Sequence, residues 1–265
     1  MPKIARFGAA DVVRTWPRFP PDADKYARGV VGVDTGSPRY PGAAVLSVLG
    51  ALNTGAGFIR FDGPDEARAA ILARAPSVTF GPGRVDAWVV GCGWDETDVA
   101  GNHQRWPRVA DAGVPMVVDA GALSLAADGV PVGSLLTPHA GELARLLGVS
   151  RDAVEAEPAE HARRAAALFR TTVLLKGHDQ FVATEDGRVT RPVGGSPWLA
   201  RAGSGDVLAG IAGTLLAQLH DPELAGLLAA SLQAQVSFTK RGPYPPDRLA
   251  EFLPSRIGEI VLVTG

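Results

Sequence analysis

The sequence predicts an α/β protein whose central, mostly parallel sheet is covered by helices on both faces. Short apolar runs rich in β-branched residues recur along the 265 residues, and alanine- and leucine-rich segments with helical spacing separate them. The runs are apolar at successive positions, which is typical of strands buried on both faces. Because no internal repeat or low-complexity linker interrupts the pattern, we expect one domain over residues 1–265. The expected strands cover residues 30–33, 58–61, 88–90, 116–118, 134–136 and 172–175.

The second half of the chain adds a hairpin and two helices to this pattern. Residues 180–184 and 188–191 flank Glu185-Asp186-Gly187, an acidic-glycine sequence that favours a β-hairpin turn. Beyond the hairpin the spacing of apolar residues becomes helical, over about residues 206–219 and again over residues 223–240. We therefore expect the sheet to be followed by a pair of long helices.

Composition and charge are those of an ordinary soluble protein. Hydrophobic residues make up 46% and charged residues 20%, and the formal net charge of −2 indicates neither nucleic acid nor a membrane as a partner. A phosphate-bearing ligand must then be held locally, by backbone amides and a few cations. The first 17 residues have no apolar core of signal-peptide length. Residues 42–59 are uncharged, but their glycines favour a buried helix, a turn and a strand. Cys92 is the only cysteine, which excludes an intrachain disulfide and fits a cytoplasmic protein.

Polar and glycine-rich clusters follow five of the expected strands. Ligands of doubly wound sheets bind beyond the carboxyl ends of the strands, so these clusters mark the edge where we expect the site. They occupy residues 34–37, 91–93, 119–123, 137–142 and 176–179.

The segment Ala202-Gly203-Ser204-Gly205-Asp206 precedes a helical pattern and indicates an anion site. Glycines let backbone amides converge, and the first amides of a helix have no internal acceptor. With the helix dipole behind them, such amides suit the charge of a transferring phosphoryl group. Asp206, which the same dipole keeps ionised at neutral pH, can take a proton from a substrate hydroxyl. Alternatively, Asp206 only caps the helix, and this segment alone leaves both interpretations open.

In chain order, the clusters form one set of motifs that covers most of the sequence. The most distinctive is Thr137-Pro138-His139 followed by Gly141-Glu142. The others are Gly36-Ser37, Tyr40, Gly42-Ala43, residues 53–57, Gly91-Cys92-Gly93, Asp119-Ala120, Ala122-Leu123, residues 146–148, Lys176-Gly177 and Gly203-Ser204-Gly205-Asp206. This set resembles the motifs of the ADP-dependent NAD(P)H-hydrate dehydratases, which have a ribokinase-like three-layer fold. Related vitamin kinases usually carry asparagine where His139 stands.

The resemblance implies an activity, its cofactors and a role for each site residue. In such enzymes an adenine nucleotide phosphorylates the hydroxyl on the hydrated nicotinamide ring of NADH or NADPH, and elimination of phosphate restores the dihydropyridine. ADP or ATP is the implied co-substrate, Mg²⁺ the implied metal ion, and a homo-oligomer, with a tetramer suggested by the family, the implied assembly. Asp206 is implied as the general base, and Glu142 as a helper that binds magnesium through water. The implied substrate contacts are Ala43, Gly93, His139 and Asp206; the implied nucleotide contacts are Lys176, Gly177, His178, Asp179, Gln180 and Gly205; the implied anion hole comprises Ala202, Gly203, Ser204 and Gly205.

Several positions depart from the family's motifs. Arg201-Ala202 stands where Thr-Gly is common, and alanine restricts φ at the entrance of the anion hole, while Arg201 can face a phosphate or point to solvent. Gly121 replaces the second aspartate of Asp-Ala-Asp, and His178-Asp179-Gln180 replaces small residues. No residues remain for the epimerase domain that is often fused to such proteins. These departures keep two alternatives open: a ribokinase-like kinase for a vitamin precursor, and a non-catalytic dinucleotide-binding protein.

Some of the named residues also have a structural interpretation. Glu142 can be an acidic residue in the first turn of a helix, where the helix dipole favours it. The sequence favours this interpretation and the magnesium role equally. We interpret His139 as a ligand contact rather than a structural strand-end residue, and Lys176 as a ligand contact rather than a solvated charge. Asp119 is interpreted as a cap of the helix that follows it. Cys92 is interpreted as a buried packing residue and not as a nucleophile.

Overall fold

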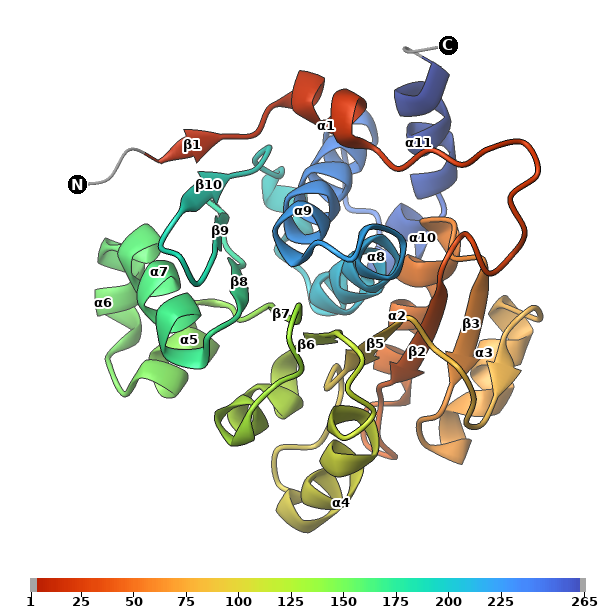
Figure 1. Cartoon of the computed structure of the whole chain (residues 1–265), viewed down its shortest axis with the longest axis horizontal. Coiled ribbons are helices and arrows are strands. Elements are labelled where there is room, and N and C mark those ends of the chain that lie inside the picture. Colours follow the sequence, from red (N-terminus) through yellow and green to blue (C-terminus); the bar gives the residue numbers. More distant parts are fainter. Residues whose placement is uncertain (1–3, 263–265) are drawn as a thin grey trace.

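Ten strands form one sheet in the computed structural model, which describes residues 4–262 (Figure 1). In spatial order they are β1 (Ala5–Arg6), β10 (Val189–Arg191), β9 (Phe181–Ala183), β8 (Thr172–Leu175), β7 (Leu135–Leu136), β6 (Met116–Val118), β5 (Ala87–Val90), β2 (Val30–Asp34), β3 (Phe58–Phe61) and β4 (Thr79–Phe80). All pairs from β8 to β4 are parallel, and only β9 runs antiparallel to its two neighbours. The expectation of a mostly parallel sheet is confirmed.

Helices lie on both faces of this sheet. They are α1 (Ala9–Thr15), α2 (Pro41–Asn53), α3 (Arg68–Arg74), α4 (Val99–Ala110), α5 (Ala140–Leu147), α6 (Arg151–Ala156), α7 (Pro158–Phe169), α8 (Ser204–Leu219), α9 (Pro222–Thr239), α10 (Pro246–Ala250) and α11 (Leu253–Leu262), with 3-10 turns η1 (Asp65–Ala67), η2 (Ala120–Asp128) and η3 (Pro197–Leu199). Figure 1 shows α8 and α9 over one face and α5 and α7 over the other. Three layers result, as the resemblance implied.

Side chains of the central strands alternate between two hydrophobic cores, one on each face. Val89 and Leu174 belong to the core that α2, α8 and α9 complete. Their neighbours Val90 and Leu175 belong to the core that α4, η2, α5 and α7 complete. Because successive strand residues point to opposite faces, both halves of each apolar run find apolar partners. This double burial explains why the strand sequences are apolar at successive positions.

Glycines hold α8 close to its neighbours. A Cβ atom at Gly210 would lie 2.1 Å from the carbonyl oxygen of Ser47 in α2. A Cβ atom at Gly213 would lie 2.2 Å from a methyl carbon of Val89 in β5. Contacts this short leave no room for a side chain, so glycine lets α8 rest directly on α2 and on the middle of the sheet. The position of the α8 N-terminus is thereby fixed by the core.

Expected and observed elements agree in the middle of the sheet and differ at its edges. The hairpin is confirmed as β9 and β10, and the two long helices after it as α8 and α9, each beginning within two residues of expectation. The sequence did not predict β1 and β4 because two-residue strands are too short for an alternation pattern to show.

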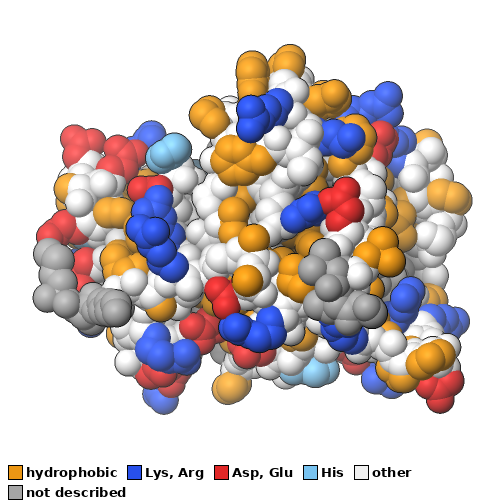
Figure 2. Space-filling view, turned by 90° about the horizontal axis from the view of Figure 1, so that it is seen from above, with side chains coloured by type: hydrophobic (Ala, Val, Ile, Leu, Met, Phe, Trp, Pro, Cys, Tyr) orange, Lys and Arg blue, Asp and Glu red, His pale blue; other side chains and the backbone are white. Residues whose placement is uncertain are grey.

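The surface carries charges of both signs. On the face shown in Figure 2, Lys and Arg side chains lie among Asp, Glu and hydrophobic side chains, without a field of one sign. This mixed face agrees with the small net charge. Within residues 4–262, no helix combines the length and the apolar character needed to cross a membrane.

Candidate active site

The carboxyl ends of β6, β7 and β8 bring together residues that are far apart in the sequence. His139 and Lys176 form an isolated parallel bridge that continues the pairing of β7 with β8. The amide of Lys176 donates to the carbonyl oxygen of Pro138 at 2.8 Å. The Lys176 side chain then reaches the end of β6, where its Nζ lies 2.5 Å from Oδ1 of Asp119. Three of the polar clusters thus meet at one edge, as parallel strands require.

Cys92, in the loop after β5, and Asp206, in the first turn of α8, lie beside Asp119 and Lys176. We call these four residues the polar centre. The thiol of Cys92 lies 3.4 Å from Oδ2 of Asp119, and the ligand atoms of Cys92, Asp119 and Asp206 all lie within 4.8 Å of one another. Burial, reinforced by the two carboxylates, raises the pKa of Cys92 well above its ordinary value. The thiol therefore stays protonated and donates to Asp119. Its complete burial agrees with the interpretation of Cys92 as a packing residue.

Burial sets the protonation of the centre. It raises the pKa of Asp206 to about 6, helped by Asp119 and opposed by Lys176, so burial outweighs the helix dipole on which the sequence-based expectation relied. Asp206 is still mostly ionised at neutral pH, and a pKa this close to neutrality suits a general base. Burial also disfavours the charge of Lys176, but Asp119 and Glu142 outweigh it and raise the pKa of Lys176. A charged lysine therefore lies among carboxylates.

The first turn of α8 offers free backbone donors. Gly203 precedes the helix with φ 92°, and no side chain caps the helix. Within the described part of the chain, the amides of Gly205 and Asp206 have no acceptor, whereas the amide of Ser204 donates to the carbonyl oxygen of Arg201 at 3.2 Å. Two amides of the first turn are therefore available to an anion, with the helix dipole behind them. Of the anion hole implied over residues 202–205, the amide of Ser204 is already engaged and the amide of Gly205 is not.

Two cavities open on opposite sides of this turn. The smaller cavity has a volume of about 350 Å³, and its lining includes Lys176 and, from α8, Gly205. The larger, about 690 Å³, is lined by Asp206 and Gly203. We call them the lysine cavity and the aspartate cavity. The lysine cavity also includes Gly177, His178, Gln180, Gly195, Ser196, Pro197, Leu199, Ala200, Ser204, Leu208 and Gln233; the aspartate cavity also includes Arg39, Tyr40, Pro41, Gly42, Ala43, Leu46, Gly93, Trp94, Asp95, Glu96, Thr97, Ala120, Gly121 and Ala202.

Most of the implied ligand contacts line one of the two cavities, and each implied group falls on one side. Of the residues implied for the substrate, Ala43, Gly93 and Asp206 line the aspartate cavity, whereas His139 lines neither cavity. Of the residues implied for the nucleotide, Lys176, Gly177, His178, Gln180 and Gly205 line the lysine cavity, whereas Asp179 is paired with Arg191 and does not line it.

His139 and Glu142 form a reciprocal cap at the start of α5. Nδ1 of His139 accepts from the amides of Gly141 at 3.0 Å and Glu142 at 3.3 Å, and Oε2 of Glu142 accepts from the His139 amide at 2.7 Å. Burial and then the charge of Lys176 lower the pKa of His139, so the ring is neutral at pH 7 and its Nε2 carries the proton. This Nε2 lies 3.3 Å from Oε1 of Glu142. Glu142 is therefore part of the cap of α5, as its structural interpretation expected, and the His139 side chain is 55% exposed to solvent.

The interpretations of Asp119 and Ala202 need correction, and Arg201 is exposed but hydrogen-bonded. Asp119 precedes η2 but caps nothing with its side chain; it holds Lys176 instead. Nη1 of the exposed Arg201 side chain donates to the carbonyl oxygen of Pro243 at 2.6 Å. The alanine at position 202 causes no strain, since the left-handed conformation falls on Gly203.

The departure at Gly121 has a local cause. A Cβ atom at Gly121 would lie 2.5 Å from the carbonyl oxygen of Trp94. Trp94 is buried and anchored, because its indole nitrogen donates to the carbonyl oxygen of Asp34 at 2.9 Å and the Arg105 guanidinium lies 4.2 Å from its ring. An aspartate at position 121 would collide with this tryptophan. The space that another side chain needs is therefore filled by Trp94.

Sequence reasoning missed several residues that line the two cavities. Arg39 and Glu96 line the aspartate cavity, and Gln233 of α9 lines the lysine cavity. Arg39 stands beside the Tyr40 that the motifs did include, so its position in chain order was a usable signal. Nothing in the sequence pattern singles out Gln233, because it lies in the middle of an otherwise buried helix.

The fold and this site define a class of protein. A mostly parallel sheet with helices on both faces is the ribokinase-like fold. The family model for NAD(P)H-hydrate dehydratase matches residues 31–255, and the chain belongs to that family.

Individual relatives agree with this assignment. The chain is 43% identical over 227 residues to the bifunctional NAD(P)H-hydrate repair enzyme Nnr of Mycobacterium tuberculosis, which covers 81% of this chain but only 46% of that protein. It is 35% identical to the ADP-dependent (S)-NAD(P)H-hydrate dehydratase of Xanthomonas campestris, covering 88% of this chain and 87% of the relative. The crystal structure of the Bacillus subtilis ADP/ATP-dependent NAD(P)H-hydrate dehydratase, co-crystallised with ATP and Mg²⁺, superposes with a TM-score of 0.90 at 26% identity, covering 98% and 100% of the two chains. The chain therefore spans about half of the mycobacterial relative and most of the other two.

Proposed function

We propose that this protein is an ADP-dependent (S)-NAD(P)H-hydrate dehydratase, a hydro-lyase that repairs hydrated NADH and NADPH. The observation that carries the proposal is the first turn of α8, which separates the two cavities and presents both a carboxylate and free amides. A reaction between two ligands needs such a shared wall, because the transferred group must pass from one cavity to the other. The names of the relatives supply the identity of the two ligands.

The lysine cavity takes the adenine nucleotide and the aspartate cavity takes the hydrated nicotinamide ring. Asp206 accepts the proton of the ring hydroxyl as its oxygen forms a bond to the terminal phosphorus of the nucleotide. The amides of Gly205 and Asp206 and the ammonium group of Lys176 stabilise the charge of the phosphoryl group during transfer. The bond between ring carbon and oxygen then breaks, phosphate leaves with the electron pair, and a proton leaves the neighbouring ring carbon. ADP is thereby converted to AMP and phosphate as the dihydropyridine is restored.

Magnesium fits this site through water. Both Glu142 oxygens already face His139, and Asp119 already holds Lys176 and Cys92, so direct coordination by these carboxylates would break existing bonds. A carboxylate oxygen that accepts one hydrogen bond can accept another, which leaves Glu142 able to hold a water ligand of the metal. When bound with the nucleotide, magnesium supplies charge neutralisation to the phosphates.

Incubation with enzymatically hydrated NADH tests the proposal. Recovery of NADH absorbance is expected with ADP and magnesium, with ADP at least as effective as ATP, and no recovery without nucleotide. Absence of recovery with either nucleotide, from folded protein, would refute the dehydratase activity. Detection of a stable phosphorylated small molecule, such as a vitamin precursor, would instead favour a kinase, and binding of both ligands without turnover would favour a non-catalytic dinucleotide-binding protein.

The assembly and the location complete the proposal. We place the enzyme in the cytoplasm. Each chain forms one domain over residues 1–265, and the chains assemble into a homo-oligomer, for which the family suggests a tetramer. Light scattering coupled to size-exclusion chromatography measures the number of chains directly, and a monomeric mass would contradict the oligomer.

A further inference from the structure

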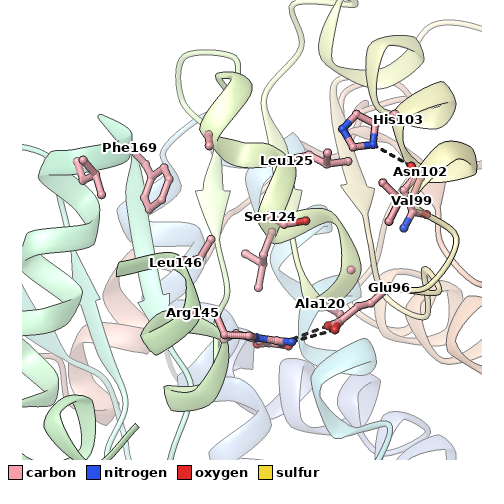
Figure 3. A pocket seen from close by; sticks show the side chains of 15 residues that line it. Glu96, Val99, Asn102, His103, Ala120, Ser124, Leu125, Arg145, Leu146 and Phe169 are labelled. Carbon is pink, nitrogen blue, oxygen red and sulfur yellow. Dashed lines mark hydrogen bonds and ion pairs between the residues drawn. The ribbon is translucent and has the colours of Figure 1, made fainter. Parts of the chain in front are cut away.

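A third cavity of about 600 Å³ lies among α4, η2, α5 and α7 (Figure 3). Figure 3 shows Phe169 and Leu146 on one side, Leu125 and His103 on the other, and Ser124 between them. The lining combines apolar residues with polar and charged ones: the apolar side chains include Val99, Leu123, Leu125, Leu146, Leu168 and Phe169, and the polar and charged ones are Glu96, Asn102, His103, Ser124, Glu142 and Arg145. A concave site with apolar walls and polar groups placed among them suits a flat heteroaromatic ring. We call it the distal cavity.

The distal cavity adjoins the aspartate cavity. Ala120, Gly121 and Glu96 line both, so the two spaces share a wall at the start of η2. Ala120 has φ 44°, a left-handed conformation that is uncommon for alanine and that turns the chain at this boundary. Gly121 packs directly against Trp94, where a Cβ atom would lie 2.5 Å from the carbonyl oxygen, so the shared wall has no side chain at position 121.

A single ion pair stands at the same boundary. Nη1 of Arg145 lies 2.9 Å from Oε2 of Glu96, and Figure 3 shows the two side chains meeting at the edge of the cavity. Their side chains are 61% and 55% exposed, so the pair contributes little to stability and can be exchanged for another anion. A phosphate group passing from one cavity to the other would meet Arg145 there, where a guanidinium can bind it through two hydrogen bonds.

We propose that the distal cavity binds the second nucleoside of the hydrated dinucleotide, with Arg145 on the pyrophosphate that links the two halves. This assignment rests on the proposed function, since it places the nicotinamide half against Asp206 in the aspartate cavity. A dinucleotide has two bases joined by a pyrophosphate, and the second base needs its own site beyond the first. The distal cavity meets this need because Glu96, Ala120 and Gly121 line it and the aspartate cavity alike.

Kinetics with a whole and a truncated substrate test the proposal. Ser124 is an exposed residue that lines the distal cavity, so Ser124→Trp fills the space without disturbing the core. The KM for hydrated NADH should rise at least about tenfold, equivalent to about 1.4 kcal/mol of binding free energy. The KM for the hydrate of reduced nicotinamide mononucleotide, which has no second nucleoside, and the KM for ADP should stay within about twofold. The matched control is Asp128→Trp, an exposed position of the same η2 that does not line the cavity.

Each outcome decides between the two proposals. Equal KM changes for both substrates, or none, in a Ser124→Trp variant of normal melting temperature would overturn the distal assignment and leave the dehydratase activity standing. If wild-type protein turns over neither substrate, calorimetric binding of NADH and of reduced nicotinamide mononucleotide replaces the kinetics. Selective weakening of NADH by Ser124→Trp would then support the distal site although the chemistry had failed. Binding of neither compound to wild-type protein would overturn both proposals.

Discussion

Two helices, α5 and α8, begin at the same edge of the sheet, and their N-termini are built in opposite ways. The amides that open α5 are satisfied within the chain, by Nδ1 of His139, while Glu142 returns a bond to the His139 amide. The amides of Gly205 and Asp206 in α8 have no acceptor within residues 4–262. A capped terminus holds the fold together, and an open one is available to a ligand anion.

The side chains beside the two N-termini differ as well: those at α5 bind each other, and the one at α8 has a raised pKa. His139 and Glu142 share hydrogen bonds that keep α5 in place, whereas Asp206 stands in the first turn of α8 with its pKa raised to about 6. Keeping a carboxylate partly buried costs folding free energy. Burial raises the pKa of Glu142 as well, but both Glu142 oxygens face His139, whereas Asp206 stands beside amides that have no acceptor within residues 4–262. We therefore expect the chemistry at α8 and a positioning role at α5.

The largest effect is expected for Asp206→Asn. Asparagine keeps the shape of the side chain and removes the base, so kcat should fall roughly a hundredfold or more, the usual scale for general-base catalysis. ADP affinity should change little, because the amides of α8 remain. Steady-state kinetics with hydrated NADH, beside a titration of ADP binding, measure both. Near-normal turnover would show that Asp206 is not the base.

The same variant should be more stable than wild type at pH 7. The folded pKa of Asp206, about 6, exceeds the ordinary value of 3.8, so the folded state binds this proton more tightly than the unfolded state does. Stability from this group is therefore present at low pH and is lost as the pH rises through 6. Removing the charge should add about 1–2 kcal/mol at pH 7, after a discount for partial exposure. Chemical denaturation at pH 7 and pH 5 measures the change, which should shrink at pH 5.

Lys176→Ala should affect both ligand binding and folding. It removes the ammonium group that lines the lysine cavity, so the Kd for ADP should rise about tenfold. It also leaves Asp119, which is only 2% exposed, without its cation, at a cost of about 3 kcal/mol of folding free energy. The double variant Lys176→Met with Asp119→Asn separates the two effects. It should recover most of the stability and none of the ADP affinity; recovery of both would assign Lys176 a structural role alone.

The pH dependence of kcat also tests the role of Asp206 at the uncapped start of α8. Since Asp206 must be deprotonated to accept a proton, kcat should fall as the pH drops below about 6, reaching roughly a tenth of its plateau at pH 5. Asp206→Asn should lose this limb and keep only its low, flat residual rate. A wild-type profile that is level down to pH 5 would mean that another group serves as the base.

Much of this arrangement follows from the sequence because it rests on local patterns. Apolar runs predicted the central strands, and Gly203-Ser204-Gly205-Asp206 predicted the helix start that α8 confirms, since glycine spacing and helix starts are encoded by neighbours in the chain. The sequence Lys-Gly at a strand end singled out Lys176. Its partner Asp119 was interpreted as a helix cap instead, because the two residues are 57 positions apart in the chain and only the order of the strands brings them together.

Long-range packing also explains what the sequence left open. The close packing of Gly121 against Trp94, and the hydrogen bond from Arg201 to Pro243, depend on how loops fold back onto one another. No spacing rule contains that information. The distal cavity likewise forms among four separate elements, so no segment of the sequence could indicate it.

The smallest effect, and the most direct test of the capped terminus, comes from two variants at His139. His139→Ala removes the acceptor of two amides, so the melting temperature should fall by a few degrees, corresponding to about 1 kcal/mol. Asparagine is a good N-cap, so His139→Asn should restore the melting temperature. The exposed Nε2 edge of the ring is lost in both variants, and if it contacts the hydrate, the KM for hydrated NADH should stay raised in both. Thermal melts and KM values for the two variants separate these contributions. A normal KM in His139→Asn would show that His139 acts through the cap of α5 and not through contact with the substrate.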